Sequence, residues 1–222
     1  MKNYLMTYHK RDVGMAFLLS TLIIDAAVLF VTFVPLIYKA NIDGFALNRV
    51  TGLSNDQIVT SFTTICQYLS IFHHGPLQVP YFTLSKHVLI HFADVRKVMI
   101  VLQLYLPIGA VLAFFLIQKA IKEREVSYLK LTAIISALIL IFFGFVGLSD
   151  FSSAFTMMHQ LLFHNNYWLM DPLVDPVINI FPEELFKLCL IAILIIIIVI
   201  NALLVALYAY FKPRLIKDPL EK

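Results

Sequence analysis

The chain alternates between long apolar segments and stretches that hold most of its polar side chains. A helix that crosses a bilayer needs about 20 consecutive, predominantly apolar residues. Four segments rich in Leu, Ile, Val and Phe meet this requirement: Val13–Tyr38, Val98–Gln118, Leu129–Leu148 and Leu188–Phe211. The pattern predicts an all-α membrane protein with four transmembrane helices, organised as a single membrane domain over residues 1–222.

The composition agrees with a chain that is solvated by lipid. Hydrophobic residues make up 60% of the chain and charged residues 14%, whereas soluble domains average about 45–50% apolar and about 25% charged residues. The first apolar segment is longer than the apolar core of a secretory signal peptide, and no A-x-A-like cleavage site follows it. We therefore expect this segment to be retained as the first transmembrane helix.

The basic residues are distributed unevenly and predict the orientation of the helices. Eleven of the 17 Lys and Arg residues lie before Val13, in the 119–130 connection, or after Phe211. Cytoplasmic flanks are enriched in Lys and Arg, so both termini are expected inside. Residues 39–97 and 149–187 then form two outer loops, which we expect to build an extracytoplasmic cap. The basic blocks are short and lack interleaved aromatic residues, so no nucleic-acid partner is indicated.

The first long loop shows two further helical patterns. In "NDQIVTSFTTICQYL" the apolar residues have helical spacing, and Ser54 or Asn55 is expected to cap the helix. In "SKHVLIHFADVRKV" Ser85 is the expected cap of a helix that leads into the second transmembrane segment. Cys66 and Cys189 both fall toward the outer side. We expect both to be packed free thiols, and a disulfide between Cys66 and Cys189 is the alternative.

Two polar residues lie at a similar depth inside the predicted transmembrane helices. Asp25 is near the middle of the first helix, and Asn201 is at a matching depth in the fourth. A carboxyl group in the middle of a bilayer is costly. We expect Asp25 to hydrogen-bond Asn201 and so fix how the two helices pack; a proton relay is the alternative.

Histidine is the strongest candidate for chemistry, because six of the seven histidines lie in the two long loops. His87 and His91 have i,i+4 spacing and share one face of a helix. This is the spacing of the zinc-protease motif H-E-x-x-H, but Val88 occupies the position of the general-base Glu. No metal or cofactor is expected, although a structural metal held by His87, His91 and a third histidine stays open. Asp94 lies one turn after His91, where a carboxylate can fix the tautomer of an imidazole.

The stretch "HQLLFHNNYWLMDPLVDPVINIFP", from His159 to Pro182, is the most polar part of an apolar region and contains no Lys or Arg. We expect its prolines to bend it back so that His159 meets His91. The sequence has no G-x-S-x-G motif for a serine nucleophile, and neither cysteine has a histidine close by in sequence. The histidines are therefore the best acid–base groups.

Two motifs give the chain a family resemblance. The segment "HFADVR" and the longer segment "FTMMHQLLFHNNYWLMDPLVDPVINIFPEELF" resemble the lipoprotein intramolecular transacylases (Lit-type integral membrane proteins) of low-GC Gram-positive bacteria. The resemblance covers nearly the whole chain, including its length, four helices, two outer loops and the order of the motifs. It implies an acyltransferase of the cell membrane. Such an enzyme moves the sn-2 acyl chain of a diacylglyceryl lipoprotein to the α-amino group of its N-terminal cysteine, giving the lyso form.

The resemblance also implies roles for individual residues. It maps the catalytic histidines onto His91 and His159, with His87 as the alternative to His91. Asn165 or Asn166 is the expected donor to the oxyanion. The lipoprotein substrate and membrane lipid are the expected partners, with no obligate protein partner. The residues expected to bind substrate or support the pocket are Asp94, Phe155, Phe163, His164, Asn165, Asn166, Trp168 and Asp171.

Two other classes of function stay open at this point. One is a non-catalytic membrane protein whose outer cap binds a metal ion or a partner, which stoichiometric zinc would favour. The other is an intermolecular lipid acyltransferase or lipase on the same scaffold. Transfer of an acyl chain between two differently labelled molecules would favour that interpretation.

Overall fold

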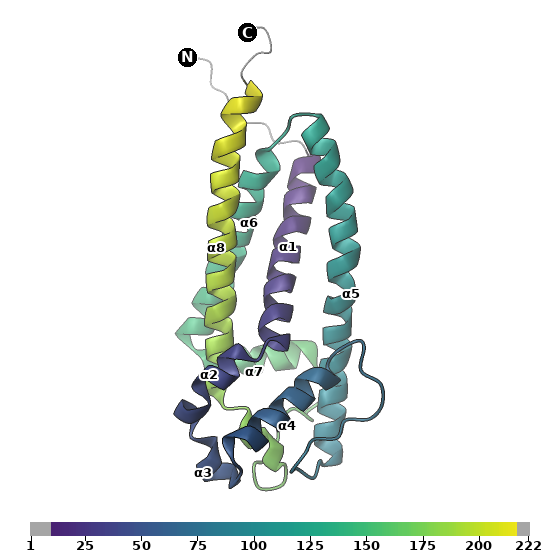
Figure 1. Cartoon of the computed structure of the whole chain (residues 1–222), viewed down its shortest axis with the longest axis vertical. Coiled ribbons are helices and arrows are strands. Elements are labelled where there is room, and N and C mark those ends of the chain that lie inside the picture. The colour runs from purple at the N-terminus through teal and green to yellow at the C-terminus, as the bar shows by residue number, and fades with distance from the viewer. Residues whose placement is uncertain (1–9, 217–222) are drawn as a thin grey trace. The chain divides into compact units, whose positions relative to one another are not determined.

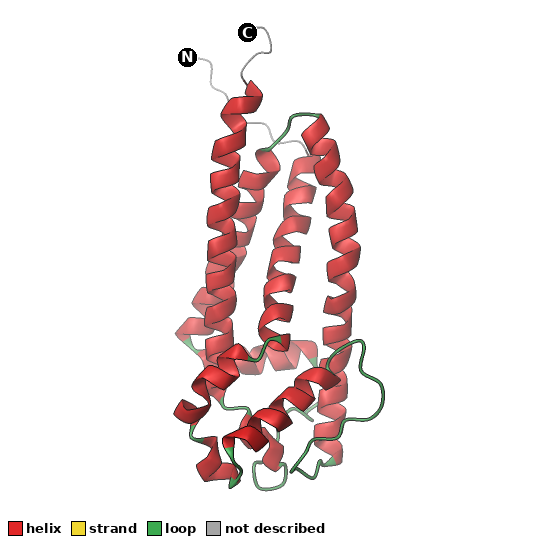
Figure 2. Ribbon diagram, in the orientation of Figure 1, coloured by secondary structure: helices red, strands yellow, loops and turns green. Residues whose placement is uncertain are grey.

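Helices make up all the regular structure of the described part of the chain. The computed structural model describes residues 10–216, with side chains through Arg214, and that range contains no strand (Figure 2). In chain order the elements in Figure 1 are α1 (Lys10–Phe33), α2 (Leu36–Phe45), α3 (Leu47–Thr51), α4 (Asn55–Tyr68), α5 (Lys86–Lys122), α6 (Ser127–Ser149), α7 (Phe151–Leu162), the 3-10 helix η1 (Pro176–Ile180) and α8 (Glu183–Ile216). Among them α1, α5, α6 and α8 are long and apolar enough to cross a membrane. The expected all-α class with four candidate membrane-spanning helices is confirmed.

All four long helices have bounds that differ from the expected segments; α8, for example, spans Glu183–Ile216 instead of 188–211. The end of α1 and the start of α5 matter most for the site. The first helix ends at Phe33, short of Tyr38, because Pro35 follows. Proline has no backbone N–H and disfavours a helical conformation in the residue before it. The helix α5 starts at Lys86 and continues without a break, so the first histidine motif and the second transmembrane segment form one helix. The first turns of α5, residues 86–97, therefore lie before the apolar run expected at 98–118.

The contacts group the chain into two compact units, which are described separately. The described part of unit 1 comprises residues 10–27, 105–143 and 194–216, and unit 2 comprises Val28–Leu104 and Gly144–Ile193. Each unit contains sections of all four long helices, and both histidine motifs fall in unit 2. The basic residues in 1–9 and 217–222, which contribute to the expected orientation, lie outside the described residues.

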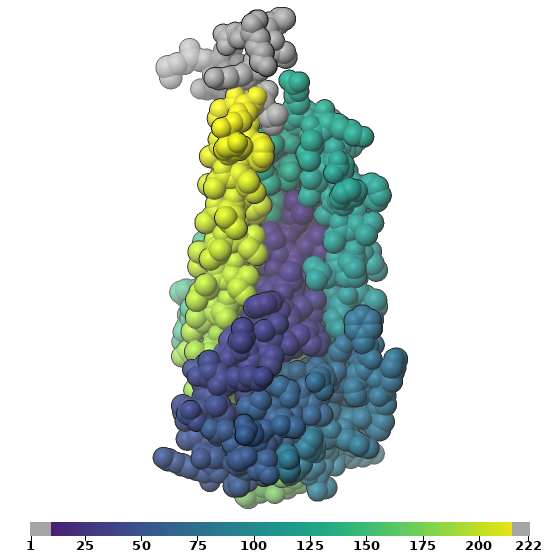
Figure 3. All heavy atoms as spheres, in the orientation of Figure 1, coloured from purple at the N-terminus to yellow at the C-terminus, as the bar shows by residue number. Residues whose placement is uncertain are grey.

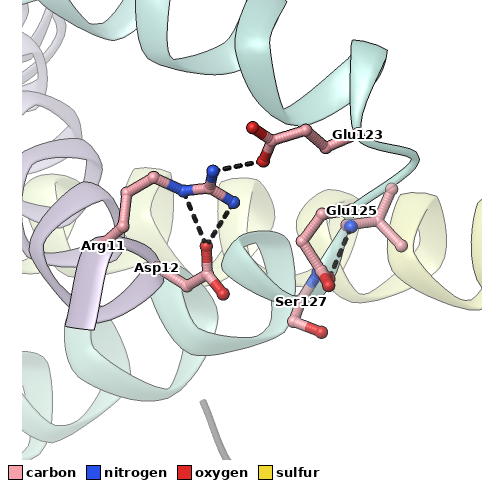
Figure 4. A network of polar contacts seen from close by, with 6 residues as sticks. Arg11, Asp12, Glu123, Glu125 and Ser127 are labelled. Carbon is pink, nitrogen blue, oxygen red and sulfur yellow. Dashed lines mark hydrogen bonds and ion pairs between the residues drawn. The ribbon is translucent and has the colours of Figure 1, made fainter. Parts of the chain in front are cut away.

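A network of charged side chains connects helix ends in unit 1 (Figure 4). The Arg11 guanidinium donates hydrogen bonds to the carboxylates of Asp12 and Glu123. Asp12 is only 2% exposed, and the guanidinium supplies the counter-charge that a buried carboxylate requires. Glu125 accepts a hydrogen bond from the backbone N–H of Ser127 at 2.6 Å. The network thereby joins the start of α1 to the connection between α5 and α6.

Hydroxyl groups link the helices in the interior of unit 1. Ser20 Oγ donates to the carbonyl of Thr132 at 3.1 Å, and Ser136 Oγ donates to Asn201 Oδ1 at 2.6 Å. These bonds connect α6 to α1 and to α8. The expected hydrogen bond between Asp25 and Asn201 is wrong: Asn201 accepts from Ser136, and Asp25 bonds no residue of the described chain. Both carboxylate oxygens of Asp25 are buried and have no hydrogen-bond partner among the described residues.

Unit 2 has a core of its own, to which both long loops contribute. Ser54 and Gln57 form a capping box at the start of α4, which confirms Ser54 as the cap. Tyr38 stacks on Phe62 with ring centroids 3.8 Å apart. Its hydroxyl donates to the carbonyl of Ile180 at 2.9 Å. This buried hydrogen bond ties the beginning of the first loop to the end of the second.

One face of unit 2 is made by α2, α3, α4 and the loop after α4, as the space-filling view shows (Figure 3). The segment that follows α7 is visible there only as a green rim. Cys66 lies in α4, and both Cys66 and Cys189 are free thiols. Burial raises the pKa of Cys66 to about 12. Because the thiolate is the reactive form, this thiol is inert at neutral pH.

Candidate active site

The first turns of α5 place two histidines in different surroundings. Ser85 accepts a hydrogen bond from the backbone N–H of Val88 at 3.3 Å, as expected of a helix cap. His91 is only 9% exposed. His87, one turn earlier, is exposed and packs edge-on against Tyr167, with ring centroids 5.0 Å apart. Of the two candidates in "HVLIH", His91 is therefore the enclosed one.

The second buried histidine, His159, belongs to α7. The Asp150 side chain caps this helix by accepting from the backbone N–H of Ser153 at 3.1 Å. His159 is 8% exposed, and its Nδ1 lies 2.8 Å from the carbonyl oxygen of Phe155. Because a carbonyl oxygen only accepts, Nδ1 carries the proton and Nε2 keeps its lone pair. The helix itself thus selects the tautomer with a free Nε2.

The two histidines lie together in an enclosure of aromatic rings. The ring centroids of His91 and His159 are 5.9 Å apart, with the planes inclined by 29°. Phe163 contacts both, at 5.2 Å from His91 and 5.6 Å from His159. Phe155 and Trp168 pack on His159, at 4.2 Å and 5.0 Å between centroids. These side chains shield the pair from water.

Asn165 links the two histidine elements through three hydrogen bonds. Its Nδ2 donates to Asp94 Oδ2 on α5 at 3.0 Å. Its Oδ1 accepts from the backbone N–H of Tyr167 at 3.1 Å, and its main-chain oxygen accepts from Trp168 Nε1 at 3.0 Å. Because Trp168 packs on His159, this one asparagine holds the segment after α7 against α5.

Both histidines are neutral near pH 7. Burial, and then the neighbouring His159, lower the pKa of His91 to about 4, while the Asp94 carboxylate opposes the shift. Burial also lowers the pKa of His159, against the opposing effect of its hydrogen bond to Phe155. An imidazole with a lowered pKa is a weaker base but, once protonated, a stronger acid. Such a pair is suited to accepting a proton briefly and returning it.

The chain can be placed in a family once this geometry is compared with known proteins. A family model described as lipoprotein intramolecular transacylase Lit matches residues 13–186. The chain belongs to the Lit family. It is accordingly an acyltransferase that processes lipoproteins, and the resemblance noted in the two motifs is confirmed.

Solved structures of a Lit enzyme agree with this assignment. The membrane-integral lipoprotein intramolecular transacylase Lit from Bacillus cereus matches with a TM-score of 0.89 at 26% sequence identity, over 92% of this chain and 95% of that one. Two structures of the same enzyme, in which one histidine is replaced by arginine or by alanine, match with a TM-score of 0.83 at 25% identity. They cover 92% of this chain and 91% or 93% of theirs. No curated protein sequence matches the chain significantly.

The other residues expected in this Lit site are divided between the enclosure and the surface. Asp94 does not bond His91, contrary to expectation; its carboxylate accepts from Lys97 Nζ at 2.8 Å and from Asn165. The Lys97 ammonium in turn lowers the pKa of Asp94. The Nδ1 of His91 is buried without a partner among the described residues. The exposed residues of the expected set are His164, Asn166 and Asp171.

The segment between His159 and Pro182 is only partly irregular. His159 lies in the last turns of a regular helix, so α7 brings it to His91, and the expectation that the prolines do so is wrong. The irregular part begins at the C-cap, Phe163. There Asp171 accepts from the backbone N–H of Leu173 at 2.9 Å and shapes the turn.

Three further aromatic residues, which were not among those expected from the sequence, extend the enclosure. Phe92 lies 5.6 Å from His91, and Phe186 lies 5.0 Å from Phe155, between ring centroids. The ring centroid of Phe181 lies 5.8 Å from that of Phe92 and 6.3 Å from that of Phe186. The sequence contained a signal for these residues. Phe92 directly follows His91 in "HFADVR", and Phe181 and Phe186 lie in "FPEELF" at the end of the second motif.

The enclosure predicts an unusual titration. We expect His91 to stay neutral at pH 5.5 in the folded protein, although a histidine in an unfolded chain has a pKa of about 6.5. The unfolded state then binds more protons, so this residue makes stability rise with pH between about 4 and about 6.5, and adds no further change above. Ring nitrogen NMR, assigned with a His91→Asn variant, measures the titration. A midpoint near pH 6.5 would contradict the enclosure.

Proposed function

We propose that this Lit enzyme moves the sn-2 acyl chain of a diacylglyceryl lipoprotein to the α-amino group of the same molecule, with His91 and His159 moving the protons. The observation that carries the proposal is the pair itself. One histidine from each long loop is buried and neutral, 5.9 Å from the other, inside an aromatic enclosure. That histidine substitutions are known in the Bacillus cereus enzyme agrees with a role for this residue type.

The proposed reaction is an isomerisation of the substrate in its neutral amine form, and the ammonium form releases one proton on the way. The histidine pair first takes a proton from the substrate's ammonium group and releases it to water. The resulting amine attacks the ester carbonyl carbon, and the free Nε2 of His159 takes a second proton from the attacking nitrogen. A C–N bond forms, and the tetrahedral intermediate then loses the glyceryl oxygen. The protonated histidine returns the proton to that oxygen, so an ester and an amine become an amide and a hydroxyl. His91, whose ring lies 5.9 Å from that of His159, shares in these proton transfers. Asn165 or Asn166 is the proposed donor to the oxyanion.

An acyl-enzyme is unnecessary, because nucleophile and ester belong to one molecule. The enzyme mainly has to hold the two groups together, and good orientation of this kind supplies about 7–11 kcal/mol of a barrier. The rings of Phe155, Phe163 and Trp168 provide rigid apolar surface for that purpose. Their positions are set by packing rather than by the substrate.

The experiment that tests the proposal uses purified enzyme and a synthetic diacylglyceryl lipopeptide. The mass of the product equals that of the substrate, because nothing leaves, so tandem mass spectrometry must locate the acyl chain on the cysteine nitrogen. Mixing a substrate with deuterated acyl chains and one with a ¹⁵N-labelled peptide distinguishes the alternatives. We expect no product that carries both labels. A doubly labelled product would show an intermolecular acyltransferase, and loss of a fatty acid would show a lipase.

We propose that the active site faces the extracytoplasmic side of a single membrane domain, with N-in and C-in termini and residues 39–97 and 149–187 forming a cap. In intact cells, an impermeant thiol reagent should label cysteines introduced at Asn55 and Asn166. A cysteine introduced at Lys122 should react only after the cells are opened. Labelling at Lys122 from outside would reverse the proposed topology.

We expect activity to survive EDTA and stronger zinc chelators. The described residues contain no group of three His, Cys, Asp or Glu side chains that could hold a metal ion, and the proposed proton transfers require none. Lyso-lipoprotein formation measured before and after chelation checks this. Loss of activity that added zinc restores would instead support the metal-binding alternative.

A further inference from the structure

The helix α7 carries an apolar stripe that the described chain leaves uncovered. Ala154, Met157, Met158 and Leu161 have the i, i+3, i+4, i+7 spacing that places side chains on one face of a helix. Met157 is 62% exposed, Met158 43% and Leu161 78%. In a water-soluble region a stripe of this kind would normally be buried against the core.

The other sides of α7 are already assigned. Phe155 and His159 face the aromatic enclosure. Ser153, Thr156 and Gln160 are exposed polar residues that run along the helix between the two apolar sides. Apolar packing therefore occurs on one side of α7, and the stripe on another side requires a different apolar environment.

The position of α7 identifies that environment. The helix begins at Phe151, directly after the candidate membrane-spanning helix α6 ends at Ser149. Ser152 Oγ in its first turn donates to Glu183 Oε2 at the start of α8, at 2.6 Å. The two long helices are close there, because a Cβ on Gly147 would meet a Leu190 methyl carbon at 2.6 Å. Within unit 2, α7 runs crosswise to α5 and α8 (Figure 1).

We propose that α7 is an interfacial helix whose stripe of Met157, Met158 and Leu161 is inserted into the acyl-chain side of the bilayer interface. Helices that span a membrane end at the headgroup level, and α7 is fastened to the ends of two of them. Phe145 and Leu148 in the last turns of α6 are 74% and 49% exposed. Lipid that covers these residues continues onto the stripe.

The chemistry of the stripe suits burial in lipid. Methionine side chains are flexible and adapt to a fluid, irregular surface. Residues 150–186 contain no Lys or Arg, so attachment depends on apolar burial and is independent of anionic headgroups. Burial of three apolar side chains of this size in lipid is enough to hold a helix that is already tethered to its neighbours.

This placement, which for its catalytic meaning rests on the proposed function, sets the depth of His159. The ester groups of a diacylglyceryl lipid lie at the boundary between headgroups and acyl chains. A helix inserted at that boundary carries His159 on its opposite side, on the headgroup side of the stripe and within about one helix diameter (roughly 10 Å) of it. The sn-2 ester then reaches the histidine pair without its acyl chain being lifted out of the membrane.

Single-tryptophan variants test the insertion directly, because Trp168 is the only tryptophan in the chain. In a Trp168→Phe background, Leu161→Trp reports on the stripe, and Gln160→Trp, one residue away on the polar side, is the matched control. Both proteins are placed in phosphatidylcholine vesicles with or without brominated acyl chains. We expect brominated lipid to quench Leu161→Trp more than Gln160→Trp, and aqueous acrylamide to give the reverse order.

A second pair keeps the test decisive if Leu161→Trp does not fold. Met157→Trp and Ser153→Trp occupy the same two sides of α7, and the same order of quenching is expected. Equal quenching of stripe and control by brominated lipid overturns the proposal, as does protection of the stripe from both quenchers, which would indicate a protein cover. Fluorescence does not depend on catalysis, so the labelled-lipopeptide assay on the unmodified protein separates failure of this inference from failure of the proposed function.

Discussion

His91→Ala and His159→Ala are each expected to lower the rate of lyso-lipoprotein formation by about 10²–10⁴-fold, the usual contribution of a positioned acid–base group. Each substitution removes one ring of the pair while leaving the caps, the salt bridges and the Asn165 link in place. Tandem mass spectrometry of a lipopeptide incubated with purified variant measures the rate. Size-exclusion profiles and thermal unfolding establish that each variant is folded.

The double variant should be little worse than either single one, because groups that act as a unit are strongly non-additive. His87→Ala and His164→Ala are matched controls, since both histidines are exposed at the surface of the same unit. Their effects should be much milder. If His87→Ala inactivated the enzyme while His91→Ala left it working, the assignment within "HVLIH" would be wrong by one turn. Full activity of His159→Ala would end the two-histidine mechanism for this chain.

Asn165→Ala is expected to give the next largest loss, up to about 10²-fold in kcat, although Asn165 itself need not touch the reacting atoms. Its side chain holds Asp94 of α5 at 3.0 Å and the backbone of Tyr167 at 3.1 Å. Without these bonds the segment that packs Trp168 on His159 is free to shift. A displacement of about 1 Å is enough to cost a factor of this size. Asn166→Ala changes the exposed neighbouring position and distinguishes the two candidate oxyanion donors. We expect a weak effect, and a loss as large as that of Asn165→Ala would assign the oxyanion to Asn166.

A reciprocal exchange separates positioning from a direct catalytic role of Asn165. Asn165→Asp alone places a second carboxylate against Asp94 and should be as harmful as the alanine variant. Adding Asp94→Asn restores one donor and one acceptor in reversed order, and kcat should recover substantially. No recovery, together with an unchanged KM, would assign Asn165 to the oxyanion instead.

Local sequence patterns predicted much of the fold because they depend on near neighbours. The four apolar runs are long enough to specify membrane-spanning helices, and Ser54 and Ser85 cap helices as their spacing to the next turn indicates. The break after Phe33 was also encoded locally, in Pro35, but the apolar character of the flanking residues concealed it. In each of these elements, the residues that determine the helix or its boundary lie within one or two turns of it.

The contacts that build the site could not be predicted in this way. The periodicity of "HVLIH" places His87 and His91 on one face, yet only packing against Phe163 and His159 determines which is buried. Asn201 accepts from Ser136 of α6, and it does not bond Asp25, the acid at matching depth. Such choices depend on residues far apart in sequence, and depth or spacing alone does not encode them.

The buried, inert thiol of Cys66 and the absence of an acyl-enzyme in the proposed reaction have a consequence for chemical biology. Electrophilic probes find acyltransferases by trapping a serine or cysteine nucleophile, and in the proposed reaction this enzyme offers them neither. Surveys based on such probes would pass over it even where it is abundant. An inhibitor would have to imitate the charge and shape of the tetrahedral intermediate, and bind reversibly between the two imidazole rings.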